Sequence, residues 1–161
     1  MSRAFWTALA IAGAVLVETA LGYLVASPGR YLDPFLLVVV YCALVGGETH
    51  GMLAGMAAGW AQDALFGGPV LGLSALSKLL VGFSVGAGAG RFLIGGAGAR
   101  GLVVLLATVA DAVLVQWLAS AFSLNADFLP PLGLAARASL NALVGGLLFA
   151  LVDRRRRRFS P

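Results

Sequence analysis

Apolar positions in this chain gather into long runs, separated by short breaks of polar residues, glycine and proline. A run of about 20 apolar residues is the length that an α-helix needs to cross a bilayer. Six candidate spans follow, over residues 5–26, 34–46, 51–66, 71–88, 101–122 and 132–152. The run at 34–46 is short, so a re-entrant segment is the alternative there. Because the breaks are short, we expect consecutive helices to be antiparallel neighbours in one all-α domain over residues 1–161.

Composition places this domain in a membrane. Of the 161 residues, 60% are hydrophobic and only 11% are charged, and the mean hydropathy is +0.96, which excludes an ordinary soluble domain. The first run is longer than the apolar core of a signal peptide and contains Glu18, so we expect it to be retained as a helix. The single cysteine, Cys42, excludes an intramolecular disulfide.

Positive charge predicts the orientation. With six spans and both termini in the cytoplasm, the inside holds eight arginines and the outside holds Arg30 alone. Five spans would divide the cationic segments between the two sides, so the positive-inside rule favours six, with both ends inside. The basic tail, residues 153–161, contains Arg154, Arg155, Arg156, Arg157 and Arg158. Such a run marks the cytoplasmic boundary of a membrane segment, and its arginines can also contact anionic lipid. It does not indicate a nucleic-acid partner.

Five ionisable residues fall within the predicted spans: Glu18, Asp63, Lys78, Asp111 and Arg137. An unpaired charge in the bilayer centre costs at least about 2.5 kcal/mol, so these residues should pair inside the protein. We expect Asp63 to pair with Lys78 across a short hairpin, Asp111 to compete for Lys78, and Glu18 to pair with Arg137. Structural pairs are favoured over a proton relay or a polar substrate cavity, because no span carries a dense ladder of carboxylates or histidines.

Glycines recur at every fourth position on two predicted helices. The residues concerned are Gly51, Gly55 and Gly59 on the third span and Gly82, Gly86 and Gly90 on the fourth. Small residues at this spacing let two helices approach closely in a membrane. We expect most of this surface to pack within the bundle, and a partner helix is the alternative occupant.

Residues that carry chemistry do not form a recognisable constellation in the sequence. The serines of the fourth span, Ser74, Ser77 and Ser84, have no histidine nearby, and the only histidine, His50, stands in a predicted inner loop beside Glu48. One histidine and one glutamate do not make a metal site. We therefore expect no catalytic residues, no metal and no cofactor.

Residues 33–82 resemble the core of the MreD family, the rod-shape-determining membrane proteins of bacterial cell-wall elongation. The pattern is a helix begun by proline, a glycine-spaced helix that ends in aspartate, a short turn, and G-x-x-A-L before a further glycine. It covers about a third of the chain and is matched by Pro34, Gly51, Gly55, Gly59, Asp63, Gly72, Ala75, Leu76 and Gly82. Trp60 and Gln62 depart from the family pattern, and Lys78 is not expected in it.

The resemblance implies a non-enzymatic scaffold of the elongation complex in the bacterial cytoplasmic membrane. Its implied partners are an MreC-like bitopic protein and the glycosyltransferase and transpeptidase pair of that complex. The MreD fold is thought to be similar to the substrate-binding S-components of vitamin transporters, so an S-component-like bundle is the expected architecture. A vitamin-binding subunit is therefore the alternative function, and an ion-coupled carrier is a third hypothesis that lacks the expected internal repeat.

Overall fold

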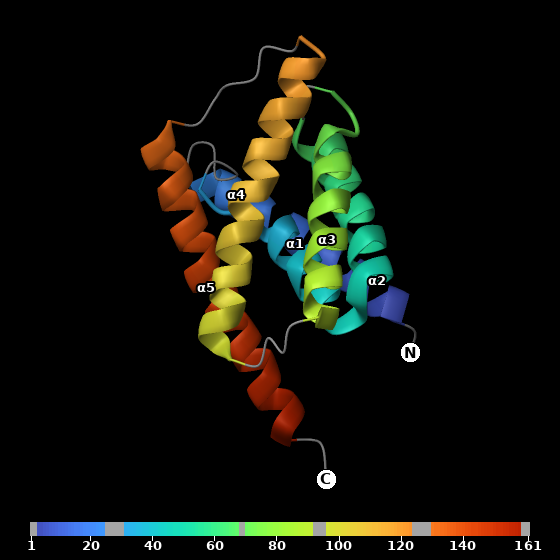
Figure 1. Ribbon diagram of the computed structural model, residues 1–161, viewed down its shortest axis with the longest axis vertical. Helices are drawn as coiled ribbons and strands as arrows, with labels where there is room; N and C mark the ends of the chain where they lie inside the picture. Colours follow the sequence, from blue (N-terminus) through green and yellow to red (C-terminus); the bar gives the residue numbers. More distant parts are fainter. Residues whose placement is uncertain (1–2, 25–30, 68–69, 92–95, 124–129, 159–161) are drawn as a thin grey trace.

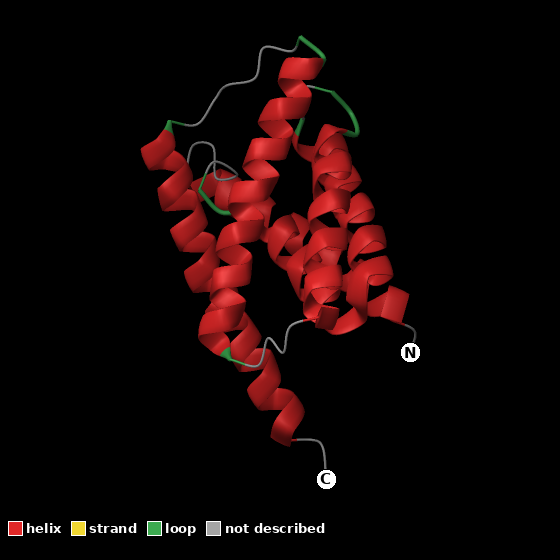
Figure 2. Cartoon of the chain, viewed as in Figure 1, coloured by secondary structure: helices red, strands yellow, loops and turns green. Residues whose placement is uncertain are grey.

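The computed structural model describes residues 3–24, 31–67, 70–91, 96–123 and 130–158. These residues form five α-helices joined by short connections (Figure 1; Figure 2). The helices are α1 (Arg3–Leu24), α2 (Pro34–Phe66), α3 (Leu73–Arg91), α4 (Ala97–Ala121) and α5 (Pro131–Arg158). Each contains a stretch long and apolar enough to cross a membrane. The prediction of an all-helical protein is confirmed for the described chain, and its helices are compatible with crossing a membrane.

Helix α2 is broken at Gly47 into two arms. Gly47 has φ 80° and ψ −171°, a conformation that is essentially restricted to glycine. A straight helix of this length would extend for about 50 Å, yet the rings of Phe35 and Phe66, near its two ends, lie 5.9 Å apart. The chain therefore reverses at Gly47, and the arms at 34–46 and 48–66 lie antiparallel. The predicted loop between them is wrong, since helix resumes at once and includes His50.

The other helix boundaries differ from the predicted spans at their ends. Helix α3 begins two residues later than expected and continues to Arg91, and α4 begins four residues earlier. Helix α5 continues through the arginine run to Arg158, where the sequence had suggested a tail after residue 152. The side chains of that run, and the predicted end of the first span at residues 25–26, lie outside the described part of the chain.

Helix α2 occupies the centre of the bundle. It packs most extensively against α3 and also contacts α1, α4 and α5, while α4 and α5 form a second close pair (Figure 1). The first arm of α2 is buried on almost every side, as expected for a helix that is apolar all round. The start of α1 and the end of α5 lie toward the same, lower end of the molecule in Figure 1.

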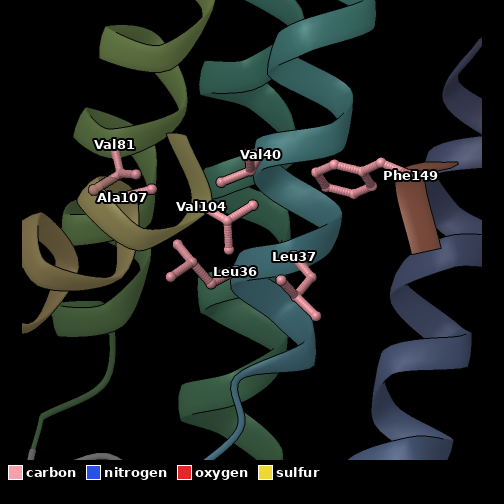
Figure 3. Packing of buried hydrophobic residues seen from close by; sticks show 7 residues of the cluster. All are labelled: Leu36, Leu37, Val40, Val81, Val104, Ala107 and Phe149. Atoms are coloured by element: carbon pink, nitrogen blue, oxygen red, sulfur yellow. The ribbon is translucent and has the colours of Figure 1, made fainter. Parts of the chain in front are cut away.

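The main apolar core lies where the first arm of α2 meets α3, α4 and α5 (Figure 3). It consists of Leu36, Leu37, Val40, Val81, Val104, Ala107 and Phe149. Figure 3 shows the ring of Phe149 reaching from α5 toward the first arm, on the side away from Val81. A long-range cluster of this kind fixes the relative positions of helices that are distant in the sequence.

The second arm of α2 and α3 are in backbone contact along the predicted glycine stripes. A Cβ atom added at Gly51 would collide with the carbonyl of Gly82, and one at Gly55 with the carbonyl of Lys78. A Cβ at Gly59 would collide with the backbone of Ala75. The stripes therefore pack within the bundle, as expected.

Gly86 shares this role further along α3. A Cβ atom placed there would lie 2.5 Å from Cα of Glu48, close to the break in α2. At Gly90, in contrast, an added Cβ atom would have nothing within 4 Å, so this glycine lies outside the contact.

Candidate functional site

Four charged side chains from four segments meet inside the bundle. Lys78 Nζ of α3 lies 2.9 Å from Oδ2 of Asp33 and 3.3 Å from Oδ2 of Asp111 in α4. Arg137 Nη2 of α5 lies 2.9 Å from the same oxygen of Asp33 and 3.9 Å from Oδ2 of Asp111. We call these four residues the ionic cluster. It contains two acids and two bases, so its formal charge is balanced.

Neutral side chains complete the hydrogen bonds of the ionic cluster. The Ser77 hydroxyl donates to Oδ1 of Asp111 over 2.7 Å. Oδ1 of Asn141 accepts from the backbone N–H of Asp33 over 3.1 Å, and its Nδ2 donates to Thr108 Oγ1 over 3.4 Å. All of these side chains are buried. Buried charges are tolerated in this way, because each carboxylate oxygen has a charged or hydrogen-bonded neighbour.

Asp33 is the member of the ionic cluster that the sequence did not reveal. It is the N-cap of α2, where its Oδ1 accepts from the N–H of Leu36 over 2.9 Å and Pro34 occupies the first helical position. Asp followed by Pro at the start of an apolar run is a known helix-start signal. That signal was available, but it indicates a cap and gives no indication that the second carboxylate oxygen faces two cations.

The expected pair of Asp63 with Lys78 is wrong. Oδ2 of Asp63 instead accepts from the backbone N–H groups of Gly72 over 2.8 Å and Ser74 over 3.0 Å. It thus caps the N-terminus of α3, where free N–H groups and the helix dipole favour a carboxylate. Lys78 lies one helical turn beyond Ser74 and pairs with Asp111, the competitor that was considered, and with Asp33.

The expected pair of Glu18 with Arg137 is also not formed. Arg137 contacts Asp33, and among the described residues no cation lies within 4 Å of the Glu18 carboxylate. Glu18 is nevertheless only 5% exposed, and its Oε2 has no hydrogen-bond partner. It is close enough to interact electrostatically with Asp33, Lys78 and Arg137. Glu18 is therefore an additional acid beside an already balanced cluster.

Two open grooves flank the bundle. One, of about 340 Å³, lies between α1 and α5 over the first arm of α2, and its lining includes Ala14, Leu37 and Val144. The other, of about 310 Å³, lies between α3 and α4. Both are lined almost entirely by apolar side chains. We refer to them as the α1/α5 groove and the α3/α4 groove.

A smaller polar contact joins α1 to α2 away from the ionic cluster. Thr7 Oγ1 lies 3.1 Å from Nε2 of His50 and 3.8 Å from Sγ of Cys42. His50 thereby has a structural partner that its predicted loop position did not suggest. Within the described ranges, no three His, Cys, Asp or Glu side chains are placed to hold a metal ion.

The arrangement as a whole holds helices together. The ionic cluster connects α3, α4, α5 and the start of α2, so its charges are used in contacts within the bundle. Comparison with known protein families, curated proteins and solved structures finds no match to this chain. The resemblance to MreD is thus carried by the sequence pattern of residues 33–82.

Proposed function

We propose that this protein is a non-enzymatic scaffold of the bacterial cell-wall elongation complex, similar to MreD, in the cytoplasmic membrane. It binds partner membrane proteins, first an MreC-like bitopic protein and then the glycosyltransferase and transpeptidase pair. In this role it positions its partners and performs no chemistry of its own.

One observation carries the proposal: seven of the nine residues of the MreD-like pattern lie where the second arm of α2 packs against α3 and its N-terminus. Pro34 starts α2, and the glycines of the second arm contact α3 backbone to backbone. Asp63 caps α3 through the N–H of Gly72, which has φ 103°. Ala75 contacts Gly59, and Gly82 contacts Gly51. A pattern most of whose members maintain one close helix pair is what a rigid scaffold requires.

The ionic cluster supports the same interpretation. Each of its four charges has an opposite charge within 4 Å, and the interior hydrogen bonds are made by neighbouring helices. Side chains paired in this way fix which helix lies beside which. A relay or an ion-coupled carrier would instead need charges that exchange partners during transport.

We further propose six membrane crossings with both ends in the cytoplasm. The reversal at Gly47 and the contact between Phe35 and Phe66 support two crossings within α2. The first arm is only about 20 Å long, less than the ~30 Å hydrocarbon core, but it is covered by protein on almost all sides. Alkaline phosphatase and green fluorescent protein fused in turn to each end test this topology. Fluorescence without phosphatase activity at both ends is expected, and phosphatase activity at either end contradicts it.

Copurification from the source membranes tests the function. Recovery of an MreC-like bitopic protein with the tagged chain is expected, and recovery of transporter ATPase subunits or a bound vitamin would establish the alternative. Gly55→Leu, which places a side chain against the backbone of Lys78, should reduce recovery of the partner. Gly88→Leu is the matched control, because no atom lies within 4 Å of its added Cβ. Equal recovery with both variants would contradict a role for the rigid α2–α3 pair.

A further inference from the structure

The α1/α5 groove lies beside Glu18, whose Oε2 has no hydrogen-bond partner in the described part of the chain. On α1, Ala10 and Ala14 line the groove, and Glu18 follows Ala14 by four residues, which places it one turn further along the same helix face. Leu32 and Pro34 line the groove on either side of Asp33. The lining of the groove is therefore apolar along its length, and the buried acids Glu18 and Asp33 are near neighbours, along the chain, of residues that line this end of it.

The other wall of the groove leads to Arg137. Val144 lines the groove on α5, and Arg137 precedes it by seven residues, two turns along the same face. The guanidinium is 12% exposed, and its Nε has no hydrogen-bond partner although Nη2 contacts Asp33. Helices α1 and α5 run in opposite directions along the groove, so Glu18 and Arg137 lie at the same end of it. Their electrostatic interaction agrees with this placement.

Charge at this end of the groove is not balanced among the described residues. With Glu18 ionised, three described carboxylates stand beside two described cations, and one carboxylate oxygen and one N–H have no hydrogen-bond partner there. A buried carboxylate without a partner is costly in a membrane. A ligand that supplies an ammonium group to Glu18 and an anionic oxygen to Arg137 would satisfy both groups.

We propose that the α1/α5 groove binds a phospholipid with a primary-amine head group, of the phosphatidylethanolamine type. An acyl chain occupies the apolar groove, the ammonium donates hydrogen bonds to Glu18, and the phosphate accepts from Arg137. Small adjustments of the two side chains are required, because Oε2 and Nε are covered in the absence of the lipid. Choline lacks N–H donors and a glycerol head group lacks the cation, so both should bind less tightly. This site is independent of the proposed scaffold function.

Native mass spectrometry of the detergent-purified protein tests the proposal. The protein is mixed with phosphatidylethanolamine, phosphatidylcholine or phosphatidylglycerol of identical acyl chains. Phosphatidylethanolamine is expected to bind about tenfold more tightly than either competitor, equivalent to about 1.4 kcal/mol. Equal retention of the three lipids, or stronger retention of phosphatidylcholine or phosphatidylglycerol, would overturn the proposal.

Three variants separate the head-group contact from the groove. Glu18→Gln removes the charge with little change of shape and should abolish the preference while the acyl chain still binds. Ala10→Phe fills the α1/α5 groove and should reduce binding of all three lipids. Ala110→Phe makes the same change in the α3/α4 groove and should leave the preference intact.

Each outcome decides the question. If Glu18→Gln still prefers phosphatidylethanolamine, the head-group assignment is overturned. If Ala110→Phe loses this preference and Ala10→Phe keeps it, the lipid binds in the α3/α4 groove and the proposed location is wrong. The proposal is also overturned if the purified wild-type protein retains a partner helix and no lipid. If Ala10→Phe does not fold, as judged by its thermal unfolding, the comparison of Glu18→Gln with the wild type is still decisive.

Discussion

Removing the Lys78 ammonium is the most informative perturbation of the ionic cluster. At 3.3 Å from Asp111 and an effective dielectric constant of about 20, Coulomb's law gives about 5 kcal/mol of attraction, before the cost of desolvation. In Lys78→Met, Asp111 keeps the Ser77 hydroxyl and only the more distant Arg137, at 3.9 Å. Breaking a buried pair from one side leaves an uncompensated charge, so we expect a loss of about 3–5 kcal/mol in the free energy of unfolding.

Restoring the charge balance should recover much of this loss. Asp111→Asn removes one negative charge and keeps an oxygen that can accept from Ser77. The double variant Lys78→Met/Asp111→Asn has one acid and one base, Asp33 and Arg137, at 2.9 Å. Its loss should therefore be smaller than the sum of the single losses by about 1–3 kcal/mol.

Unfolding by sodium dodecyl sulfate in mixed micelles measures these free energies. The control is a second cycle, Asp63→Asn with Lys78→Met, which should be additive within about 0.5 kcal/mol because Asp63 contacts the α3 backbone and not the ammonium. Additivity in the first cycle, or coupling in the second, would refute the pairing described above.

Variants at three further positions, Gly55, Gly47 and Asp63, test the backbone features. Gly55→Ala should destabilise the protein by about 1–3 kcal/mol through overpacking, whereas Gly88→Ala, with open space around it, should be neutral or stabilising by up to about 1 kcal/mol. The same micelle assay compares them, and equal effects would contradict the close helix contact. Gly47→Ala should cost about 1–3 kcal/mol, because φ 80° with ψ −171° strains any residue with a Cβ; an unchanged midpoint would disprove the sharp reversal. Asp63→Ala should cost about 0.5–2 kcal/mol as a lost helix cap, with Asp63→Asn less affected, and the reverse order would contradict the capping role.

The helices and the glycine contacts could be predicted from the sequence because both depend on short-range periodicity. A long apolar run must form a helix in lipid, where backbone groups have no other partners. Glycine at every fourth position marks a smooth face whatever helix lies against it. The sharp break at Gly47 was harder to predict from the sequence. Two helical arms joined through one glycine have nearly the same sequence pattern as two arms joined through a short loop.

Apart from the contact of Asp111 with Lys78, the pairing of the charges could not be predicted, because it depends on how distant helices face one another. Asp63 and Lys78 are close along the chain, but the N-terminus of α3 already satisfies Asp63 through its backbone. Lys78 lies one turn deeper and faces Asp33 and Asp111, which are 45 and 33 residues away along the chain. Asp33 falls outside the predicted spans, although its place before Pro34 marks it as a cap.

The ionic cluster also imposes an order on membrane insertion. Asp33 enters the membrane early in synthesis, but its first cation, Lys78, arrives only with α3, and Asp111 then restores an excess of negative charge. Arg137 is supplied by α5, which follows the other four described helices along the chain. With α1 to α4 inserted, the ionic cluster still has two acids and one base, and only α5 balances it. A chain that stalls before α5 therefore leaves a buried carboxylate of the cluster without the second cation that Arg137 supplies in the complete arrangement.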